Sequence, residues 1–215
     1  DKWSPASRGR ERTALALPAT DLIVLFGAGG GTKDHHKGAD LFFRALEALQ
    51  DLLDDVGDHR SLRGVVFGEA GPEQFHGRVR VSFLGRLIDQ ELRLAYSAAN
   101  VMVVPSRMDN LPSTAVEAHA CGTPVAAFRV GGLPDIVEDG VTGRLAEPGD
   151  SDDLARAIAW ITQDPKREKA LGDAARHRAL SLWNPSQIAH QYLAVIREAA
   201  VSRDRAKPRV ACLHL

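Results

Sequence analysis

Two carboxylates, Asp109 and Glu117, are the residues best suited to chemistry in this sequence, and seven residues lie between them. That interval contains Pro112 and Ser113, which are typical of the first turn of a helix. A helix starting there would present free N–H groups to an anion such as a phosphate. Because side chains tilt toward the N-terminal end of their helix, Glu117 would approach the same site, where it could accept hydrogen bonds from a ribose diol.

Apolar runs alternate along the chain with helical patterns, which is typical of a parallel sheet covered on both faces. Strands are expected at 22–27, 64–68, 79–84, 101–104, 124–128 and 143–146. Helices are expected at 11–18, 39–53, 91–98, 112–121 and 134–137, and then at 151–162, 165–182 and 185–200. This alternation predicts an α/β fold, a doubly wound, Rossmann-like parallel sheet of about six strands followed by C-terminal helices.

The glycine-rich and polar breaks follow the carboxyl ends of the predicted strands. They span residues 27–37, 68–71, 85–89, 105–110 and 129–134. Because the carboxyl ends of parallel strands meet at one rim of the sheet, that rim is the expected ligand site.

The first break contains enough glycine for backbone N–H groups to approach a phosphate closely. It matches neither of two better-known phosphate loops. A Walker loop needs a lysine between glycine and Ser or Thr, whereas Lys33 follows Thr32, and Thr32 also replaces the third glycine of a dinucleotide fingerprint. Taken alone, a lysine in this break is more typical of a solvated surface charge than of a phosphate ligand. The candidates for phosphate binding in this break are Gly29, Gly30 and Lys37.

Composition excludes several classes of function. A net charge of −1 gives no electrostatic reason to expect nucleic-acid binding, and 44% hydrophobic residues are ordinary for a globular fold. No apolar run approaches the roughly 18 residues of a membrane span. Cys121 and Cys212 make no disulfide framework, so a reducing cytoplasm is the simplest setting. His35-His36 and His119-x-Cys121 lack the ligand spacing of a zinc site, and no metal is expected.

The stretch from Pro105 to Asp135 resembles the donor-binding, C-terminal half of glycosyltransferase family 4, whose members have the two-domain GT-B fold. The resemblance rests on Cys-Gly-Thr-Pro-Val at 121–125, on Gly-Gly-Leu-Pro-Asp at 131–135 and on an acid pair. In that pair Asp109 stands where Glu is more usual, and Glu117 matches the second Glu. The sequence Asp-Asn-Leu-Pro, which begins at the first acid, is similar to the sequence at this place in branches of the family that assemble bacterial surface polysaccharides.

The resemblance implies a retaining glycosyltransferase of the hexosyltransferase type. Its donor half would bind a nucleotide-diphosphate sugar, for transfer to a glycan or lipid-linked acceptor in polysaccharide biosynthesis. The donor is a co-substrate, and no cofactor is expected. As implied catalytic residues, Lys37 would pair with the diphosphate and Asp109 would lie near the sugar, while Glu117 would bind the ribose. The other implied donor contacts are Gly29, Gly30, Gly85, Arg86, Leu87, Asn110, Leu111, Pro112 and Ser113.

Two positions depart from the family pattern. Ala28 stands where many members have an arginine, so a bidentate clamp on the diphosphate is absent. Pro112, which has no N–H, stands where many relatives have glycine. Lys33, Arg107 or backbone N–H groups are candidates to compensate. The two departures favour, as an alternative, a non-catalytic nucleotide-sugar-binding module. A sugar-nucleotide epimerase, which can share the two-domain architecture, is the other alternative.

The resemblance also predicts the domain organisation. Residues 1–20 would connect from a missing N-terminal acceptor domain, residues 21–200 would form the donor-binding domain, and residues 201–215 would be a loose tail. This half alone is expected to bind donor and to transfer nothing. The full enzyme is expected in the cytoplasm, and any peripheral contact with the inner face of the membrane would come through the missing domain.

Overall fold

The computed structural model describes residues 2–27 and 29–205, with side chains up to residue 200. The chain divides into two units between Ala179 and Leu180. The first unit contains the sheet, the helices before α7 and most of α7, and the second contains the end of α7 and α8, Pro185–Arg205. The candidate site lies in the first unit.

Seven strands form one sheet, in the order β3-β4-β2-β1-β5-β6-β7. They are β1 Leu22–Gly27, β2 Leu62–Phe67, β3 Gln74–His76, β4 Val79–Phe83, β5 Val101–Val104, β6 Val125–Phe128 and β7 Gly143–Ala146. All neighbours are parallel except β3 and β4. The six predicted strands are confirmed. The additional strand, β3, was not predicted, because its three residues are largely exposed and carry no apolar pattern.

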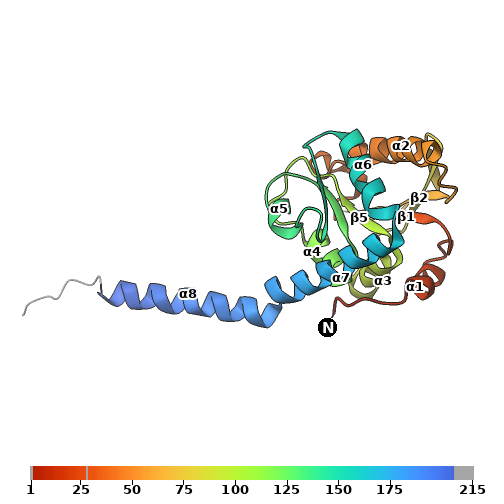
Figure 1. The fold of residues 1–215 in the computed structure, drawn as a ribbon. Coiled ribbons are helices and arrows are strands. Elements are labelled where there is room, and N and C mark those ends of the chain that lie inside the picture. Colours follow the sequence, from red (N-terminus) through yellow and green to blue (C-terminus); the bar gives the residue numbers. More distant parts are fainter. Residues whose placement is uncertain (1, 28, 206–215) are drawn as a thin grey trace, which may run out of the picture. The chain divides into compact units, whose positions relative to one another are not determined.

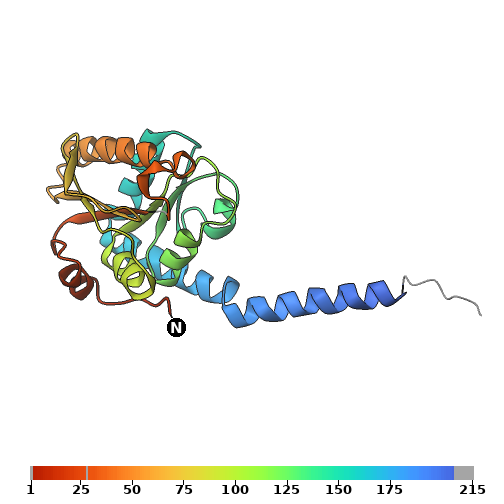
Figure 2. The same cartoon turned by 180° about the vertical axis from the view of Figure 1, so that it is seen from behind.

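Helices cover both faces of the sheet, which confirms the doubly wound α/β prediction (Figures 1 and 2). The α-helices of the first unit are α1 Arg8–Ala14, α2 Ala39–Asp55, α3 Asp89–Ala98, α4 Ser113–Ala120, α5 Leu133–Ile136, α6 Ser151–Thr162 and α7 Pro165–Leu182, and two short 3-10 turns are η1 Gly31–Lys33 and η2 His35–Lys37. Helices α2 and α6 pack together over one face, and α3 and α4 contact each other. No helix among the described residues is both long and apolar enough to cross a bilayer.

The strands are buried on both faces, because alternate side chains enter different layers of the core. Leu22, Val24 and Phe26 of β1 join the cluster that contains α2 and α6. Ile23 and Leu25 are equally buried but lie outside that cluster. This two-sided burial accounts for the continuous apolar runs in the sequence.

The predicted boundaries differ most from the structure near the two ends of the chain. The first helix, α1, begins and ends earlier than the predicted 11–18, and its end is followed by Ala16 at a φ of 54°. Helix α8 continues to Arg205, so the first five residues of the predicted 201–215 tail are helical. Residues 206–215 lie outside the described part of the chain.

Arg12 joins α1 to the amino-terminal rim of the sheet. Its side chain is buried and donates to the carbonyl of Ala98 at 2.9 Å and to Asn100 Oδ1 at 2.8 Å. The same Asn100 oxygen accepts from the backbone N–H of Ile23 at 2.9 Å. Burial lowers the pKa of Arg12 to about 10, which leaves it charged at neutral pH. These contacts fix the amino-terminal ends of β1 and β5. The candidate functional site lies at the carboxyl ends of the same two strands.

His119 is fully buried in α4, and neither ring nitrogen has a hydrogen-bond partner. Burial, followed by the nearby charge of Arg178, lowers the pKa of His119 to about 3, although the backbone of Thr142 acts in the opposite direction. The histidine is therefore neutral in the folded protein. An unfolded histidine binds a proton below about pH 6.5.

We expect His119→Leu to flatten the pH dependence of the free energy of unfolding between about pH 6.5 and pH 3. The stability that His119 contributes is fully present above about pH 6.5 and is lost as the pH falls, because only the unfolded chain takes up the proton. Chemical denaturation at a series of pH values measures this slope. His59→Leu, at an exposed histidine, is the control, and equal slopes for His119→Leu and the unmodified chain would contradict the expectation.

Candidate functional site

The site lies where the direction of winding of the sheet reverses. From β1 the chain builds outward through β2 and β4, and from β5 it builds the opposite way through β6 and β7. The loops that leave β1 and β5 therefore run to opposite sides and leave a crevice at the carboxyl ends of the two strands. Lys37 follows β1 and Asp109 follows β5, so the topology brings together two residues 72 positions apart.

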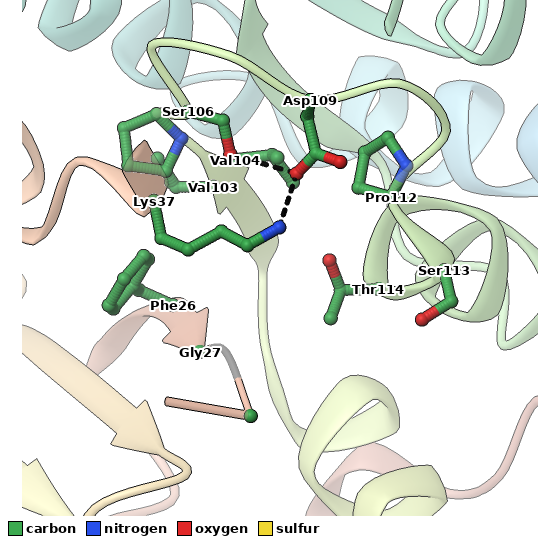
Figure 3. A pocket seen from close by; sticks show the side chains of 12 residues that line it. Phe26, Gly27, Lys37, Val103, Val104, Ser106, Asp109, Pro112, Ser113 and Thr114 are labelled. Atoms are coloured by element: carbon green, nitrogen blue, oxygen red, sulfur yellow. Dashed lines mark hydrogen bonds and ion pairs between the residues drawn. The ribbon is translucent and has the colours of Figure 1, made fainter. Parts of the chain in front are cut away.

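One cavity at this crevice, which we call the lysine pocket, has a volume of about 120 Å³ and is lined by Lys37, Asp109, Gly29, Ser113 and Thr114, among others. The ammonium of Lys37 donates to Asp109 Oδ2 at 2.7 Å (Figure 3). The hydroxyl of Ser106 donates to the same oxygen at 3.2 Å. The side chain of Asp109 is 11% exposed and that of Lys37 is 33% exposed, so both charges face the pocket rather than open solvent.

The amino terminus of α4 forms the opposite wall of the lysine pocket (Figure 3). Pro112 precedes the helix with a φ of −66°, which proline provides without strain. Ser113 and Thr114 begin the helix, and first-turn N–H groups have no acceptor within it. The amino terminus of the helix thus carries a partial positive charge, and the ammonium of Lys37 carries a full one. Both favour an anion in the pocket.

A second cavity, the glutamate pocket, has a volume of about 300 Å³ and adjoins the first, because both are lined by Gly29, Ser113 and Thr114. Glu117 lines it together with Arg86, Leu87 and Tyr96. The hydroxyl of Tyr96 donates to Glu117 Oε2 at 2.9 Å. Burial raises the pKa of Glu117, whereas the bond from Tyr96 and the charge of Lys2 act to lower it.

Close backbone contacts hold the segment between β5 and α4, residues 105–112, which we call the β5–α4 loop. A Cβ at Gly38 would overlap the carbonyl oxygen of Pro105, and one at Gly131 would overlap the carbonyl oxygen of Asp109. Gly38 and Gly131 also have φ values of +70° and +52°, which glycine adopts without strain. Gly132 approaches the next carbonyl, that of Asn110, in the same way. Glycines thus hold the loop from both sides.

Arg107 joins the β5–α4 loop to the loop that carries Lys37. Its guanidinium binds both carboxylate oxygens of Asp40, at 2.8 and 2.7 Å, and donates to the carbonyl of His35 at 3.0 Å. Its backbone N–H donates to the carbonyl of His36 at 2.8 Å. The guanidinium lowers the pKa of Asp40. Arg107 therefore positions Lys37 through the backbone of the two residues before it and through the side chain of Asp40 after it.

Eight of the residues predicted from the sequence line one or both pockets: Gly29, Lys37, Arg86, Leu87, Asp109, Pro112, Ser113 and Glu117. Four others line neither: Gly30, Gly85, Asn110 and Leu111. Gly85 instead exchanges backbone hydrogen bonds with the loop after β2, at 2.8 and 3.0 Å. Ala28 lies outside the described residues.

Two contributors to the site are not among the residues predicted from the sequence. Tyr96 lies in a predicted helix to which the sequence assigns no function, and Ser106 donates to Asp109. Thr114, which lines both pockets, belongs to the first turn of the helix that is predicted to face the diphosphate. In the part of the chain that the structure describes, no group of three or more His, Cys, Asp or Glu residues could hold a metal ion. Metal independence stays a prediction.

The sequence and the fold were compared with known proteins. The family described as glycosyl transferases group 1 matches residues 8–178. A D-inositol 3-phosphate glycosyltransferase of Saccharomonospora viridis is 35% identical over 192 residues, covering 83% of this chain and 43% of that protein. A sucrose-phosphate synthase of Thermosynechococcus elongatus is 32% identical with a TM-score of 0.74, covering 94% of this chain and 50% of that one. Anabaena HepE, solved with UDP-glucose, shares the fold with a TM-score of 0.74 at 22% identity, covering 92% and 54%.

The chain thus spans about half the length of the curated relatives that it matches. The proteins with similar sequences are named as glycosyltransferases, and none of these comparisons favours the epimerase alternative. The predicted relationship to the donor-binding half of family 4 enzymes is therefore confirmed at the level of family and fold.

Gly38→Ala is expected to disrupt the lysine pocket, whereas Gly57→Ala is not. Both glycines have positive φ, +70° and +68°, so each substitution carries about 1–2 kcal/mol of backbone strain. A Cβ at Gly57 meets nothing within 4 Å, but at Gly38 it collides with the carbonyl of Pro105. Chemical denaturation should therefore show a larger loss of stability for Gly38→Ala. Equal losses of stability in the two variants would mean that the contact between Gly38 and Pro105 does not contribute to stability.

Proposed function

Because this chain belongs to the group 1 glycosyltransferases, we propose that it is the donor-binding half of a retaining glycosyltransferase and binds a nucleotide-diphosphate sugar. The observation that carries this proposal is the pair of adjoining pockets at the switch point of the sheet. One offers a lysine and a helix amino terminus, and the other offers a half-buried carboxylate. A nucleoside diphosphate has matching parts, an anionic diphosphate and a diol-bearing ribose.

The nucleoside part occupies the glutamate pocket in this proposal. Glu117 accepts hydrogen bonds from the ribose hydroxyls, which an ionised carboxylate does through its two oxygens. Arg86 and Leu87 line the part of the pocket that follows β4 and contact the base. A volume of about 300 Å³ is at the lower limit for a small-molecule site, consistent with a nucleoside entering from the open rim.

The diphosphate occupies the lysine pocket and meets Lys37 and the first turn of α4. During transfer, negative charge grows on the departing diphosphate as the sugar acquires oxocarbenium character. Groups already fixed around that charge stabilise it, and one such donor contributes about 3 kcal/mol in well-studied enzymes. Asp109 and Ser106 lie beside Lys37, where the transferred sugar would join the diphosphate.

The activity of the whole protein is a wider proposal. The acceptor is a glycan or a lipid-linked sugar, and it is held by a separate N-terminal domain across a cleft that closes by hinge motion. Transfer retains the anomeric configuration and needs no bound metal. The buried free thiol of Cys121 fits a reducing cytoplasm as the place of action. This half alone binds donor weakly and transfers nothing.

Glu117→Gln is expected to weaken UDP binding by about 1–3 kcal/mol, the range for losing a charged hydrogen-bond partner. UDP is the first nucleotide to test, because Anabaena HepE, which shares this fold, was solved with UDP-glucose. Isothermal titration calorimetry with UDP and with 2′,3′-dideoxy-UDP measures the effect. The variant should lose affinity for UDP and little for the dideoxy compound, which has no diol. An equal loss for both ligands, or no loss, would remove Glu117 from ribose binding.

Lys37→Met is expected to reduce affinity for UDP and to leave affinity for uridine nearly unchanged, because only UDP carries the diphosphate. Lys166→Met is the matched control, since Lys166 is exposed on α7 and lines neither pocket. Titration of both variants with both ligands separates the two contributions. A loss of uridine affinity in Lys37→Met would instead indicate that the site as a whole has collapsed.

Asp109→Asn should tighten UDP binding. Asp109 forms an ion pair with Lys37, and its negative charge would repel an incoming diphosphate. Calorimetry at low and high salt measures the gain, which should shrink as salt screens the charges. Weaker UDP binding in this variant would show that Asp109 contacts the donor as an acceptor of hydrogen bonds.

A further inference from the structure

We propose that Tyr96 is a positioning residue for the donor site, because its hydroxyl holds one oxygen of Glu117 and leaves the other oxygen to the ligand. This inference rests on the proposed function, since the ligand in question is the ribose of the donor. Tyr96 lies in α3, and its sequence context predicts only a buried core aromatic. In this inference its hydroxyl also contributes to ligand recognition.

The contact between the two side chains is direct. Tyr96 Oη donates to Glu117 Oε2 at 2.9 Å, and both residues line the glutamate pocket. Tyr96 is fully buried and Glu117 is half-buried, so little water competes for the bond. Burial and the carboxylate of Glu117 both raise the pKa of Tyr96, which keeps the phenol protonated and therefore a donor at every working pH.

Aromatic contacts fix the direction of that donor. The ring of Tyr96 meets Phe67 of β2 edge-on, with ring centroids 5.8 Å apart and planes at 87°. On another side it meets Trp3 at 5.9 Å and 70°. Such edge contacts restrict the ring to one orientation. A fixed phenol can then fix Glu117, which would otherwise rotate about three side-chain bonds and lose conformational freedom when a ligand binds.

Charged groups also surround Glu117, and they define its electrostatic setting. Lys2 favours the ionised form and Asp89 opposes it, and these two form an ion pair at 2.8 Å. Cys121 lies beyond the end of α4, where Glu117 and burial help to keep it a neutral thiol, and Arg86 lines the same pocket. The bond from Tyr96 is the largest of the effects that favour the carboxylate. Removing it should make Glu117 easier to protonate.

Tyr96→Phe tests the inference, because it removes the hydroxyl and keeps the ring. The chain has one other tyrosine, Tyr192, which is exposed on α8 and supplies the matched control Tyr192→Phe. Carbon-13 NMR of the Glu117 carboxyl, titrated against pH without ligand, should give a higher midpoint in Tyr96→Phe. The midpoint in Tyr192→Phe should equal that of the unmodified chain. An unchanged midpoint in Tyr96→Phe would overturn the inference.

Nucleotide binding provides the second measurement. At neutral pH we expect Tyr96→Phe to bind UDP roughly tenfold more weakly, the effect of one hydrogen bond to a charged group. The acid limb of its affinity profile should move to higher pH, which a merely structural role of the ring would not cause. Affinity for 2′,3′-dideoxy-UDP should hardly change.

The outcomes separate this inference from the proposed function. If the unmodified chain binds UDP and Glu117→Gln weakens that binding, the donor site stands. An unaltered affinity and pH profile in Tyr96→Phe would then overturn the role of Tyr96 alone. If the unmodified chain binds none of UDP, GDP and ADP, the proposed function fails and the inference fails with it. A shifted Glu117 titration without any change in UDP affinity would reduce Tyr96 to a structural contact.

Discussion

The site depends on backbone packed directly against backbone at the β5–α4 loop. Gly38 on one side and Gly131 with Gly132 on the other leave no space for a Cβ against the carbonyls of Pro105, Asp109 and Asn110. Contacts of this kind are less tolerant than contacts between side chains, because a backbone cannot adopt another rotamer. These contacts hold the backbone of the loop in place, and with it the backbone of Asp109 and the start of α4. Hydrogen bonds from Lys37 and Ser106 then orient the carboxylate of Asp109.

That constraint explains how two distant parts of the chain form a single electrostatic unit. Lys37 comes from the loop after β1, whereas Asp109 and α4 come from the loop after β5. Arg107 spans the two loops through Asp40 and through the carbonyls of His35 and His36. The sheet brings the two loops to the same rim. The contacts of Arg107 then hold the loops close enough for Lys37 to donate a hydrogen bond to Asp109.

The sequence predicted the parts of the site that have a local signature. Buried strands appear as apolar runs, and Lys37 and Asp109 lie in breaks that follow strand ends, so their places at the rim could be found without coordinates. The position of Glu117 followed from the tilt of side chains along the predicted helix. The role of Lys37 came from the family resemblance, because a lysine in that break is by itself more typical of a solvated surface charge. Contacts made over long distances in the sequence carry no such signature. Tyr96 looks like an ordinary core aromatic in a helix. Arg107 was a candidate for the diphosphate, and nothing near it in the sequence predicts its pairing with Asp40. The edge strand β3 was missed because its pairing with β4, rather than any apolar pattern, makes it a strand.

In the proposed function, the pair of Lys37 and Asp109 determines what would change when a donor binds. An ammonium at a partly enclosed site needs a counter-charge, and Asp109, with Ser106 beside it, supplies one. A bound diphosphate would bring further negative charge to this pocket, more than Lys37 alone would balance. The first turn of α4 would then supply the remaining positive potential. Because the glycine contacts already hold that turn, its dipoles would need little reorganisation as charge developed on the leaving group.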